Sequence, residues 1–400
     1  MWQQIRSNRT RSVFLVIVMG VLLALLGYFL GLYFVGSGAV GLFIALIIWV
    51  IMSLVGYFQG DSILLATSRA KKIAPDDHPR LYNVVEEMKI ASGLEAMPDI
   101  YIMDDPALNA FATGRNPKKA TVAVTSGLLQ KLNRNELQGV VGHEIAHVKN
   151  RDVLLMAMCA VLLGTIVVLA WYASRFFIFG GMGRTRRSSS SGGSGGQIII
   201  LALAIILMIL APIFAQLIYF ALSRRREYLA DASSALYTRY PEGLASALEK
   251  LAASTDQLKS ANKATAPMYI INPFRKQGMS AEDLTSTHPP ISERIRILRA
   301  MSGASYEDYS AAYQQVRHTD KAFISAAEAL ATGSVALRAA QPEVPEKLEE
   351  VQRVRETTNA LWNVHKYKTI TCACGTKLRL PPSYKLPEVK CPHCGRINPV

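Results

Sequence analysis

The chain contains 400 residues, of which 50% are hydrophobic, and it carries a formal net charge of +14 at pH 7. A soluble domain can reach this apolar fraction, so average composition alone does not place the chain in a membrane. The distribution of charge says more, because no Asp, Glu, Lys, Arg or His occurs between Ser12 and Gly60. A run of this length excludes a chain that is soluble throughout and indicates membrane-spanning segments.

This first uncharged run predicts two spans, Val13–Phe34 and Val40–Tyr57, separated by Gly36-Ser37-Gly38. Each span has about the 20 residues that cross the hydrocarbon core of a bilayer. The run exceeds the apolar core of a signal peptide, and no small-residue cleavage site precedes a mature domain. Residues 1–60 are therefore expected to remain as a transmembrane hairpin in contact with membrane lipid.

The middle of the chain holds two further apolar stretches, Val153–Ser174 and Ile198–Leu222. Their lengths predict a second transmembrane hairpin within residues 153–223. The SSSSGGSGG segment between them is typical of a flexible, solvated linker. Two core helices buried in a soluble domain are the alternative interpretation of this pair.

The soluble segments predict a mainly α fold with a small β-sheet. Asp77–Ile90 has the apolar spacing of a helix, whereas Asp99–Met103, Ala110–Thr113 and Thr121–Thr125 have the composition of short strands. Asn133-Arg-Asn-Glu136 supplies the cap and the acidic residue that begin a helix through VVGHEIAHV. Three later helices are expected, at Arg224–Tyr240, Glu242–Ser254 and Ile291–Met301.

Basic residues at the ends of the spans predict the orientation of the chain. Those that flank spans one, two and four place the soluble parts in the cytoplasm: Arg6, Arg9, Arg11, Arg69, Lys71, Lys72, Arg224, Arg225 and Arg226. The loop between spans three and four argues the other way, with Arg175, Arg184, Arg186 and Arg187. We follow the majority and expect a multi-pass protein of the cell inner membrane. Charge beside membrane spans also explains the basic composition through anionic lipid headgroups, so a nucleic-acid partner is disfavoured.

The segment His143-Glu-Ile-Ala-His147 has the spacing of a metal site on a helix. Imidazoles at i and i+4 project from one face, so both can reach a Zn²⁺ ion at about 2.0–2.1 Å. Glu144 follows the first histidine and can act as a general base on water without being a ligand. A surface helix with two ordinary histidines is the alternative.

A catalytic zinc ion needs a third protein ligand, and Glu227 is the candidate. Asp231 lies on the same helical face and is expected to orient a ligand histidine. A salt-bridged face among the neighbouring arginines is the alternative. The predicted second hairpin supports the metal site. Because the chain crosses the membrane twice between His147 and Glu227, both residues are expected on the same face of the bilayer.

At these residues the chain resembles the HtpX-type membrane zinc metalloproteases, relatives of the CAAX prenyl endopeptidases. The resemblance runs from about residue 1 to residue 302 and rests on His143-Glu-Ile-Ala-His147, Glu227-Tyr-Leu-Ala-Asp231 and the paired apolar segments. It implies a gluzincin-like peptidase domain that hydrolyses peptide bonds in one step. It also implies protein substrates, namely misfolded or membrane proteins cut on the cytoplasmic side during quality control and stress response.

The resemblance implies roles for two further groups of residues. Asn109, Ala110, Phe111 and Ala112 are similar to a stretch that forms an edge strand and pairs with extended substrate. His288 is implied to stabilise the oxyanion of the tetrahedral intermediate, with Arg294 supporting the site. A buried strand, with Asn109 as a turn residue, is the alternative for the first group.

The C-terminal module departs from this family pattern. Its cysteines, Cys372, Cys374, Cys391 and Cys394, form a four-thiolate signature that predicts a zinc ribbon with a structural second zinc ion. Two disulfides are the alternative, which a cytoplasmic location disfavours. Because base-stacking aromatic residues are scarce, contact with protein or gating of substrate is preferred for the ribbon.

The preferred interpretation is therefore a membrane zinc endopeptidase. We divide the chain into the first hairpin, 1–60; a protease domain in two parts, 61–152 and 224–302; the second hairpin, 153–223; a helical linker, 303–365; and the ribbon, 366–400. A catalytically silent adaptor that recruits partners through the ribbon is one alternative, and Glu144 argues against it. A membrane-tethered nucleic-acid binder is another, and it leaves the histidine motif unexplained. The sequence does not indicate an oligomeric state.

Overall fold

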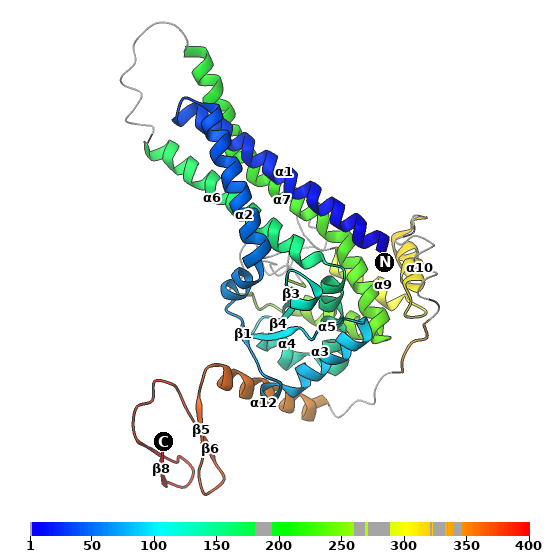
Figure 1. Ribbon diagram of the computed structural model, residues 1–400. Coiled ribbons are helices and arrows are strands. Elements are labelled where there is room, and N and C mark those ends of the chain that lie inside the picture. The colour runs from blue at the N-terminus through cyan, green and yellow to red at the C-terminus, as the bar shows by residue number, and fades with distance from the viewer. Residues whose placement is uncertain are drawn as a thin grey trace.

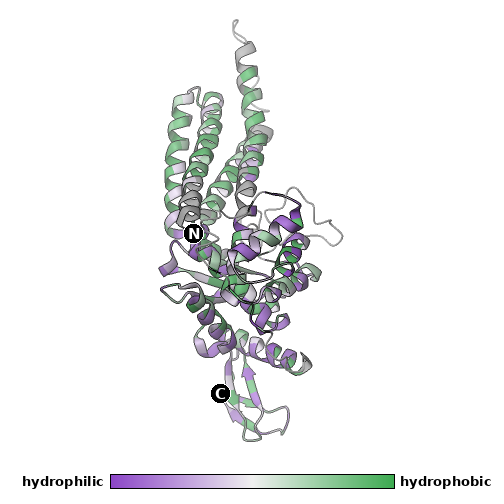
Figure 2. Ribbon diagram, turned by 90° about the vertical axis from the view of Figure 1, so that its right-hand side faces the viewer, coloured by the Kyte–Doolittle hydropathy of each residue, from purple (hydrophilic) through white to green (hydrophobic). Residues whose placement is uncertain are grey.

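The computed structural model describes residues 2–180, 194–259, 269–270, 289–320, 322, 333, 335–339 and 346–400. Long helices extend from one end of a central helical domain, and a small β-module lies at its other end (Figure 1). Apolar residues cover the long helices, whereas hydrophilic residues are common over the central domain and the β-module (Figure 2). The expected fold class, mainly α with small sheets, is confirmed.

Four long helices carry the apolar segments: α1 (Trp2–Phe34), α2 (Gly38–Thr67), α6 (Asp152–Gly180) and α7 (Ser194–Thr238). In the described part of the chain, three stretches are long and apolar enough to cross a membrane, Val13–Phe34, Gly38–Thr67 and Asp152–Arg175. The fourth predicted span corresponds to a shorter apolar stretch of α7, Leu201–Leu217. Residues 181–193, which include most of the expected Gly/Ser linker, lie outside the described residues.

Glycine residues allow α1 and α2 to pack closely in the first hairpin. A Cβ atom added to Gly41 on α2 would overlap the carbonyl oxygen of Gly27 on α1. The turn between the helices uses Gly36, whose φ of +74° is the left-handed conformation that glycine adopts without strain. The predicted Gly36-Ser37-Gly38 turn therefore joins two helices whose backbones approach each other directly.

Helix α7 continues without a break from its apolar stretch into the soluble domain. We expected a separate helix at Arg224–Tyr240, and this boundary is wrong, because one helix spans Ser194–Thr238. Between Gln216 and Arg226 the sequence has no Gly or Pro that would end a helix. The candidate ligand Glu227 is consequently part of the same rigid element as the fourth apolar stretch.

The central sheet has the strand order β1-β2-β4-β3. The predicted strands are confirmed as β2 (Asp99–Met103), β3 (Ala110–Thr113) and β4 (Thr121–Thr125), and β1 (Lys71–Lys72) was not predicted. β2 and β4 are parallel, with Ile100 opposite Val122, whereas β3 runs antiparallel to β4 and forms an edge of the sheet.

Helix α5 (Arg134–Lys149) lies at the centre of the soluble domain and carries the histidine motif. Its predicted N-terminus is confirmed, since Glu136 N donates to the Asn133 side chain at 2.9 Å and Asn133 N donates to Glu136 at 2.8 Å. Lys250 and Ser246 also donate to Glu136. The helices of this domain other than α5 are α3 (Pro79–Ser92), α4 (Ser126–Lys131), α8 (Pro241–Ala253), α9 (Ile291–Arg299) and α10 (Tyr306–Arg317), with short 3₁₀ turns η1 (Pro75–Asp77) and η2 (Pro117–Lys119).

Helix α12 (Glu346–Val364) fixes the C-terminal module to the soluble domain. The buried Arg353 donates to the carbonyl oxygen of Gln130 at 3.1 Å, and Thr357 lies 3.4 Å from His78 Nε2. Beyond this helix, Arg379 stacks 3.3 Å from the ring centre of Trp362. The module has two two-stranded sheets, β5 (Lys368–Thr371) with β6 (Lys377–Leu380) and β7 (Glu388–Lys390) with β8 (Ile397–Pro399).

Candidate active site

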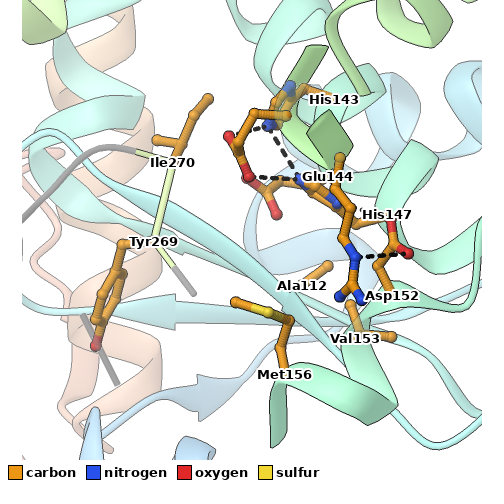
Figure 3. Close-up of a pocket in the computed structure, with 11 residues that line it drawn as sticks. Ala112, His143, Glu144, His147, Asp152, Val153, Met156, Tyr269 and Ile270 are labelled. Carbon is orange, nitrogen blue, oxygen red and sulfur yellow. Dashed lines mark hydrogen bonds and ion pairs between the residues drawn. The ribbon is translucent and has the colours of Figure 1, made fainter. Parts of the chain in front are cut away.

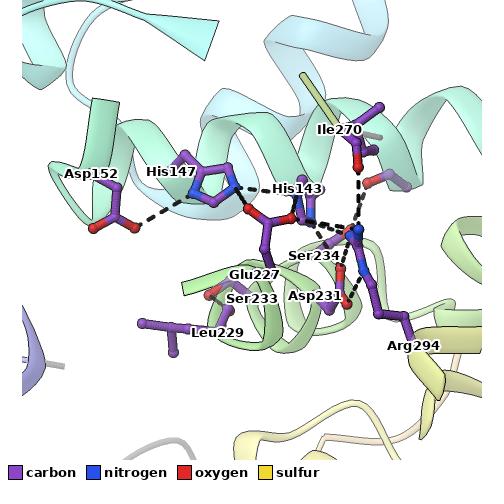
Figure 4. Close-up of polar contacts among 11 residues, drawn as sticks. His143, His147, Asp152, Glu227, Leu229, Asp231, Ser233, Ser234, Ile270 and Arg294 are labelled. Atoms are coloured by element: carbon purple, nitrogen blue, oxygen red, sulfur yellow. Dashed lines mark hydrogen bonds and ion pairs between the residues drawn. The ribbon is translucent and has the colours of Figure 1, made fainter. Parts of the chain in front are cut away.

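Side chains from α5 and α7 converge in the arrangement of a metal site. His143 Nε2 lies 3.2 Å from His147 Nε2, and Glu227 places one oxygen 3.5 Å from His143 Nε2 and the other 3.4 Å from His147 Nε2 (Figure 4). Ligand atoms about 2.0–2.1 Å from a tetrahedral ion lie roughly 3.3–3.4 Å from one another. The three separations therefore fit a single zinc ion.

The ligands meet because α5 and α7 pack against each other at the ends of two apolar segments. α5 ends at Lys149, and α6 begins three residues later at Asp152, so His147 lies directly before the third predicted span. α7 returns from the apolar bundle and carries Glu227 to the same place. The predicted ligand side chains from these two parts of the chain therefore lie side by side.

Glu144 points into the same pocket as the ligand side chains (Figure 3). Its side chain is only 2% exposed, and burial raises the pKa of its carboxyl group above the usual value. One contact is a hydrogen bond with the backbone of Ala112. Within the described residues Oε1 has no hydrogen-bond partner, so this oxygen is available to a water molecule beside the metal site.

Asp231 supports the first histidine from the side opposite the metal site. Its Oδ1 lies 2.9 Å from His143 Nδ1, and Arg294 binds both carboxylate oxygens, at 2.7 and 2.8 Å. Burial by itself opposes ionisation of Asp231, but Arg294 and His143 outweigh it and hold the pKa of the carboxyl group below its usual value. Arg294 also lies 3.5 Å from Glu227, so it contacts the ligand that completes the site.

Asp152 has a similar position beside the second histidine, and the sequence analysis did not identify it. Its Oδ2 lies 3.5 Å from His147 Nδ1, and its Oδ1 lies 3.7 Å from Nε of the buried Arg226. Arg226 directly precedes Glu227, so this ion pair joins the beginning of α6 to the ligand-bearing part of α7. A lone acidic residue at the start of an apolar run was the available signal, because such a charge is costly unless it is paired.

The predicted substrate strand has a more enclosed setting than expected. β3 is an edge strand, but Asn109, Ala110, Phe111 and Ala112 are all buried. Asn109 accepts a hydrogen bond from Thr125 N through its carbonyl oxygen and one from Ala110 N through its side chain. The neighbouring residue Ala112 lines the pocket that contains Glu144. His288, the expected oxyanion-stabilising residue, lies outside the described residues.

The four C-terminal cysteines form a second cluster with metal-binding geometry. Cys372 Sγ lies 3.6 Å from Cys394 Sγ, and Cys374 Sγ lies 3.7 Å from Cys391 Sγ. Sulfur ligands about 2.3 Å from a tetrahedral zinc ion lie roughly 3.8 Å apart, whereas a disulfide bond is only about 2.05 Å long. The alternative of two disulfides is therefore wrong, since all four cysteines are free thiols.

The fold and the site define a membrane zinc metallopeptidase, in which one half of the metal centre lies on α5, directly before the apolar helix α6, and the other half lies on α7. The family model for peptidase family M48 matches residues 75–302, and the chain belongs to this family. The protein is thus a metal-dependent hydrolase of peptide bonds whose substrates are proteins.

The comparison with curated proteins confirms the resemblance to HtpX-type proteases. The chain is 45% identical over 300 residues to a protease HtpX homologue of Dictyoglomus turgidum. This alignment covers 75% of this chain and 94% of the homologue. It is 40% identical over 301 residues to a protease HtpX homologue of Streptococcus uberis. That alignment covers 75% of this chain and 100% of the homologue. The crystal structure of S. mikatae Ste24p aligns with 74% of this chain and 66% of that chain, at 19% identity and a TM-score of 0.37.

Proposed function

We propose that this peptidase is an endopeptidase that cleaves misfolded or membrane proteins at the cytoplasmic face of the cell inner membrane, as part of protein quality control. The observation that carries the proposal is the mutual separation of 3.2–3.5 Å among ligand atoms of His143, His147 and Glu227. These atoms come from α5 and α7, and each of them lies close to an apolar segment. Such a site acts on polypeptide at the membrane surface.

In this proposal, the carboxylates beside the ligand histidines hold the imidazoles in place. Asp231 accepts from Nδ1 of His143, which leaves Nε2 directed at the metal position. Asp152 orients His147 in the same way, with its Oδ2 3.5 Å from Nδ1 of the ring. Arg294 keeps Asp231 ionised and oriented, because its guanidinium binds both carboxylate oxygens.

The chain's own residues supply the proton transfers of hydrolysis. Zinc, when bound, acts as a Lewis acid that polarises the scissile carbonyl group and makes water a stronger acid. Glu144 accepts a proton from the attacking water through Oε1, and its raised pKa makes the carboxylate a stronger base than an exposed one. The same carboxyl group then donates the proton to the leaving nitrogen, so no covalent enzyme intermediate is required.

The substrate is expected to lie extended beside β3. Ala112 belongs to this strand and also borders the pocket, so a peptide paired with β3 would bring its backbone next to Glu144. Recognition through backbone groups accepts many sequences, which suits unfolded segments of different proteins. A folded domain offers no free extended segment and would be excluded.

The ribbon is proposed as a structural zinc domain, which gives the chain two zinc ions. Since the family model ends at residue 302, residues 303–400 are treated as an addition to the peptidase, with 303–365 as linker and 366–400 as ribbon. The contacts of α12 with Gln130 and His78 attach this helix, which directly precedes the ribbon, to the peptidase domain. This attachment suits a role in protein contact near the active domain.

The decisive experiment compares purified wild type with Glu144→Gln, each in detergent with zinc and an unfolded membrane protein. Loss of fragments in mass spectrometry, with zinc content retained, would support the endopeptidase. The ribbon supplies an internal reference for zinc content in both samples. Equal fragmentation by both proteins, or none by wild type with its zinc sites filled, would instead favour the silent adaptor.

A further inference from the structure

The dipeptide Tyr269-Ile270 occupies the outer edge of β3 beside the active-site pocket (Figure 3). Ile270 N donates a hydrogen bond of 3.1 Å to the carbonyl oxygen of Ala110. The ring of Tyr269 packs edge-on against that of Phe111, with ring centres 5.4 Å apart. Tyr269 is 3% exposed and Ile270 is 1% exposed, so the dipeptide is enclosed by the domain.

The alternation of backbone groups along β3 explains why this contact matters. Asn109 faces β4, since its carbonyl oxygen accepts from Thr125 N at 3.0 Å. The backbone groups of the next residue, Ala110, point away from β4, because successive residues of a strand face opposite sides. The carbonyl oxygen of Ala110 is therefore an acceptor that an added peptide strand would use, and Ile270 already occupies it.

The same dipeptide is also connected to the metal site. Arg294 Nη1 donates to the carbonyl oxygen of Ile270 at 3.3 Å, while the rest of the guanidinium binds Asp231 (Figure 4). Both backbone polar groups of Ile270 are thus used, one by the sheet edge and one by the residue that supports His143. The dipeptide is held in the position of a short additional strand.

We propose that Tyr269-Ile270 is an autoinhibitory contact that takes the place of substrate on β3. The proposal rests on the proposed function, because it assumes that substrate pairs with this edge. A peptide must supply its own N–H to Ala110 and displace Ile270 before it can lie beside Glu144. Its apparent affinity is therefore lowered in proportion to the small fraction of molecules in which the dipeptide has left the strand.

Substitution of Ile270 by Pro tests the contact directly, because proline has no N–H to donate. In the full-length protein with zinc, cleavage of an internally quenched extended peptide is expected to rise in kcat/KM by about threefold to tenfold, the effect of one lost hydrogen bond. Zinc content should not change. Ile270→Val keeps the donor and removes only one methylene group, so it should activate less than Ile270→Pro.

A second variant and a second readout guard against a folding defect in Ile270→Pro. Tyr269→Ala removes the ring contact with Phe111 but keeps the backbone, and it should also raise kcat/KM, mainly by lowering KM. In the Glu144→Gln protein, which binds without cleaving, saturating peptide should speed hydrogen exchange at the Ile270 amide. Hydrogen exchange at this amide reports whether peptide displaces the dipeptide, and it does not depend on catalytic turnover.

The outcomes separate this proposal from the proposed function. If Ile270→Pro and Tyr269→Ala cleave no faster than wild type, or if peptide slows exchange at Ile270, the dipeptide is part of the substrate-binding wall and the autoinhibitory proposal is overturned. In that case wild type still cleaves, and the peptidase assignment stands. If no variant cleaves any substrate although zinc is bound, the proposed function itself has failed.

Discussion

The Asp231 carboxylate lies 2.9 Å from Nδ1 of His143, on the opposite side of the imidazole from the Nε2 atom that faces His147. Arg294 fixes the carboxylate through both oxygens. His143 is thus oriented from behind by two buried charged groups, the Asp231 carboxylate and the Arg294 guanidinium.

Asp231→Asn should weaken zinc binding at the active site by about 10- to 100-fold, because an amide holds the imidazole less firmly. Competition with a chromophoric chelator on the full-length protein measures this affinity. Asp152→Asn is the matched comparison, and its effect should be smaller because its contact with His147 is 3.5 Å rather than 2.9 Å. Wild-type affinity in Asp231→Asn would contradict the assigned role.

The two metal sites should be separable by substitution. Glu227→Ala should lose the active-site zinc ion and proteolysis while the ribbon keeps its own zinc ion. Cys391→Ser should do the reverse, with the active-site zinc ion retained. Elemental analysis of the purified proteins reports both results. Loss of both ions from either variant would show that the sites are not independent.

His78 should make the stability of the protein depend on pH. Burial lowers the pKa of His78 from 6.5 to about 4, so between these values the unfolded chain binds a proton that the folded one does not. Stability is therefore full above about pH 6.5 and falls as the pH drops towards 4, by up to roughly 3 kcal/mol.

His78→Asn is the variant that tests this pH dependence. Asparagine can still cap α3, as His78 does by accepting from Leu81 N, but it does not titrate. The thermal midpoint in detergent should then change less between pH 7 and pH 4.5 than in wild type. Equal pH dependence in both proteins would assign the effect to other groups.

Gly41→Ala should destabilise the first hairpin, since the added methyl group would overlap the carbonyl oxygen of Gly27. Overpacking of this kind costs about 1–3 kcal/mol, and the thermal midpoint should fall. Gly164→Ala is the matched control in another apolar helix, because a Cβ atom there meets nothing within 4 Å. A midpoint that falls equally in both variants would count against close helix packing.

Local features of this protein could be predicted from sequence because they depend on residues close together in the chain. The i, i+4 spacing of His143 and His147 places them on one helical face whatever surrounds the helix. Short apolar runs between turn residues predicted the strands at Ile100, Phe111 and Val122. An Asn followed three residues later by a Glu predicted the capping box at Asn133. The spacing of the two cysteine pairs likewise predicted the four-thiolate cluster of the ribbon.

Contacts between remote segments required the folded chain. Composition could not reveal that Asp152 lies beside His147, that α7 runs unbroken to Glu227, or that Ile270 bonds to Ala110. α12 was expected as part of a linker, yet the buried Arg353 and Thr357 fix it to the peptidase domain.

The amino-acid sequence by itself determined which elements form and which side chains can bind metal, because helix periodicity and apolar length act locally. Only the tertiary structure decided which of those groups meet. Packing brings together residues that are tens to hundreds of positions apart in the chain, and the free energy of that packing is shared among many contacts rather than encoded in any one motif.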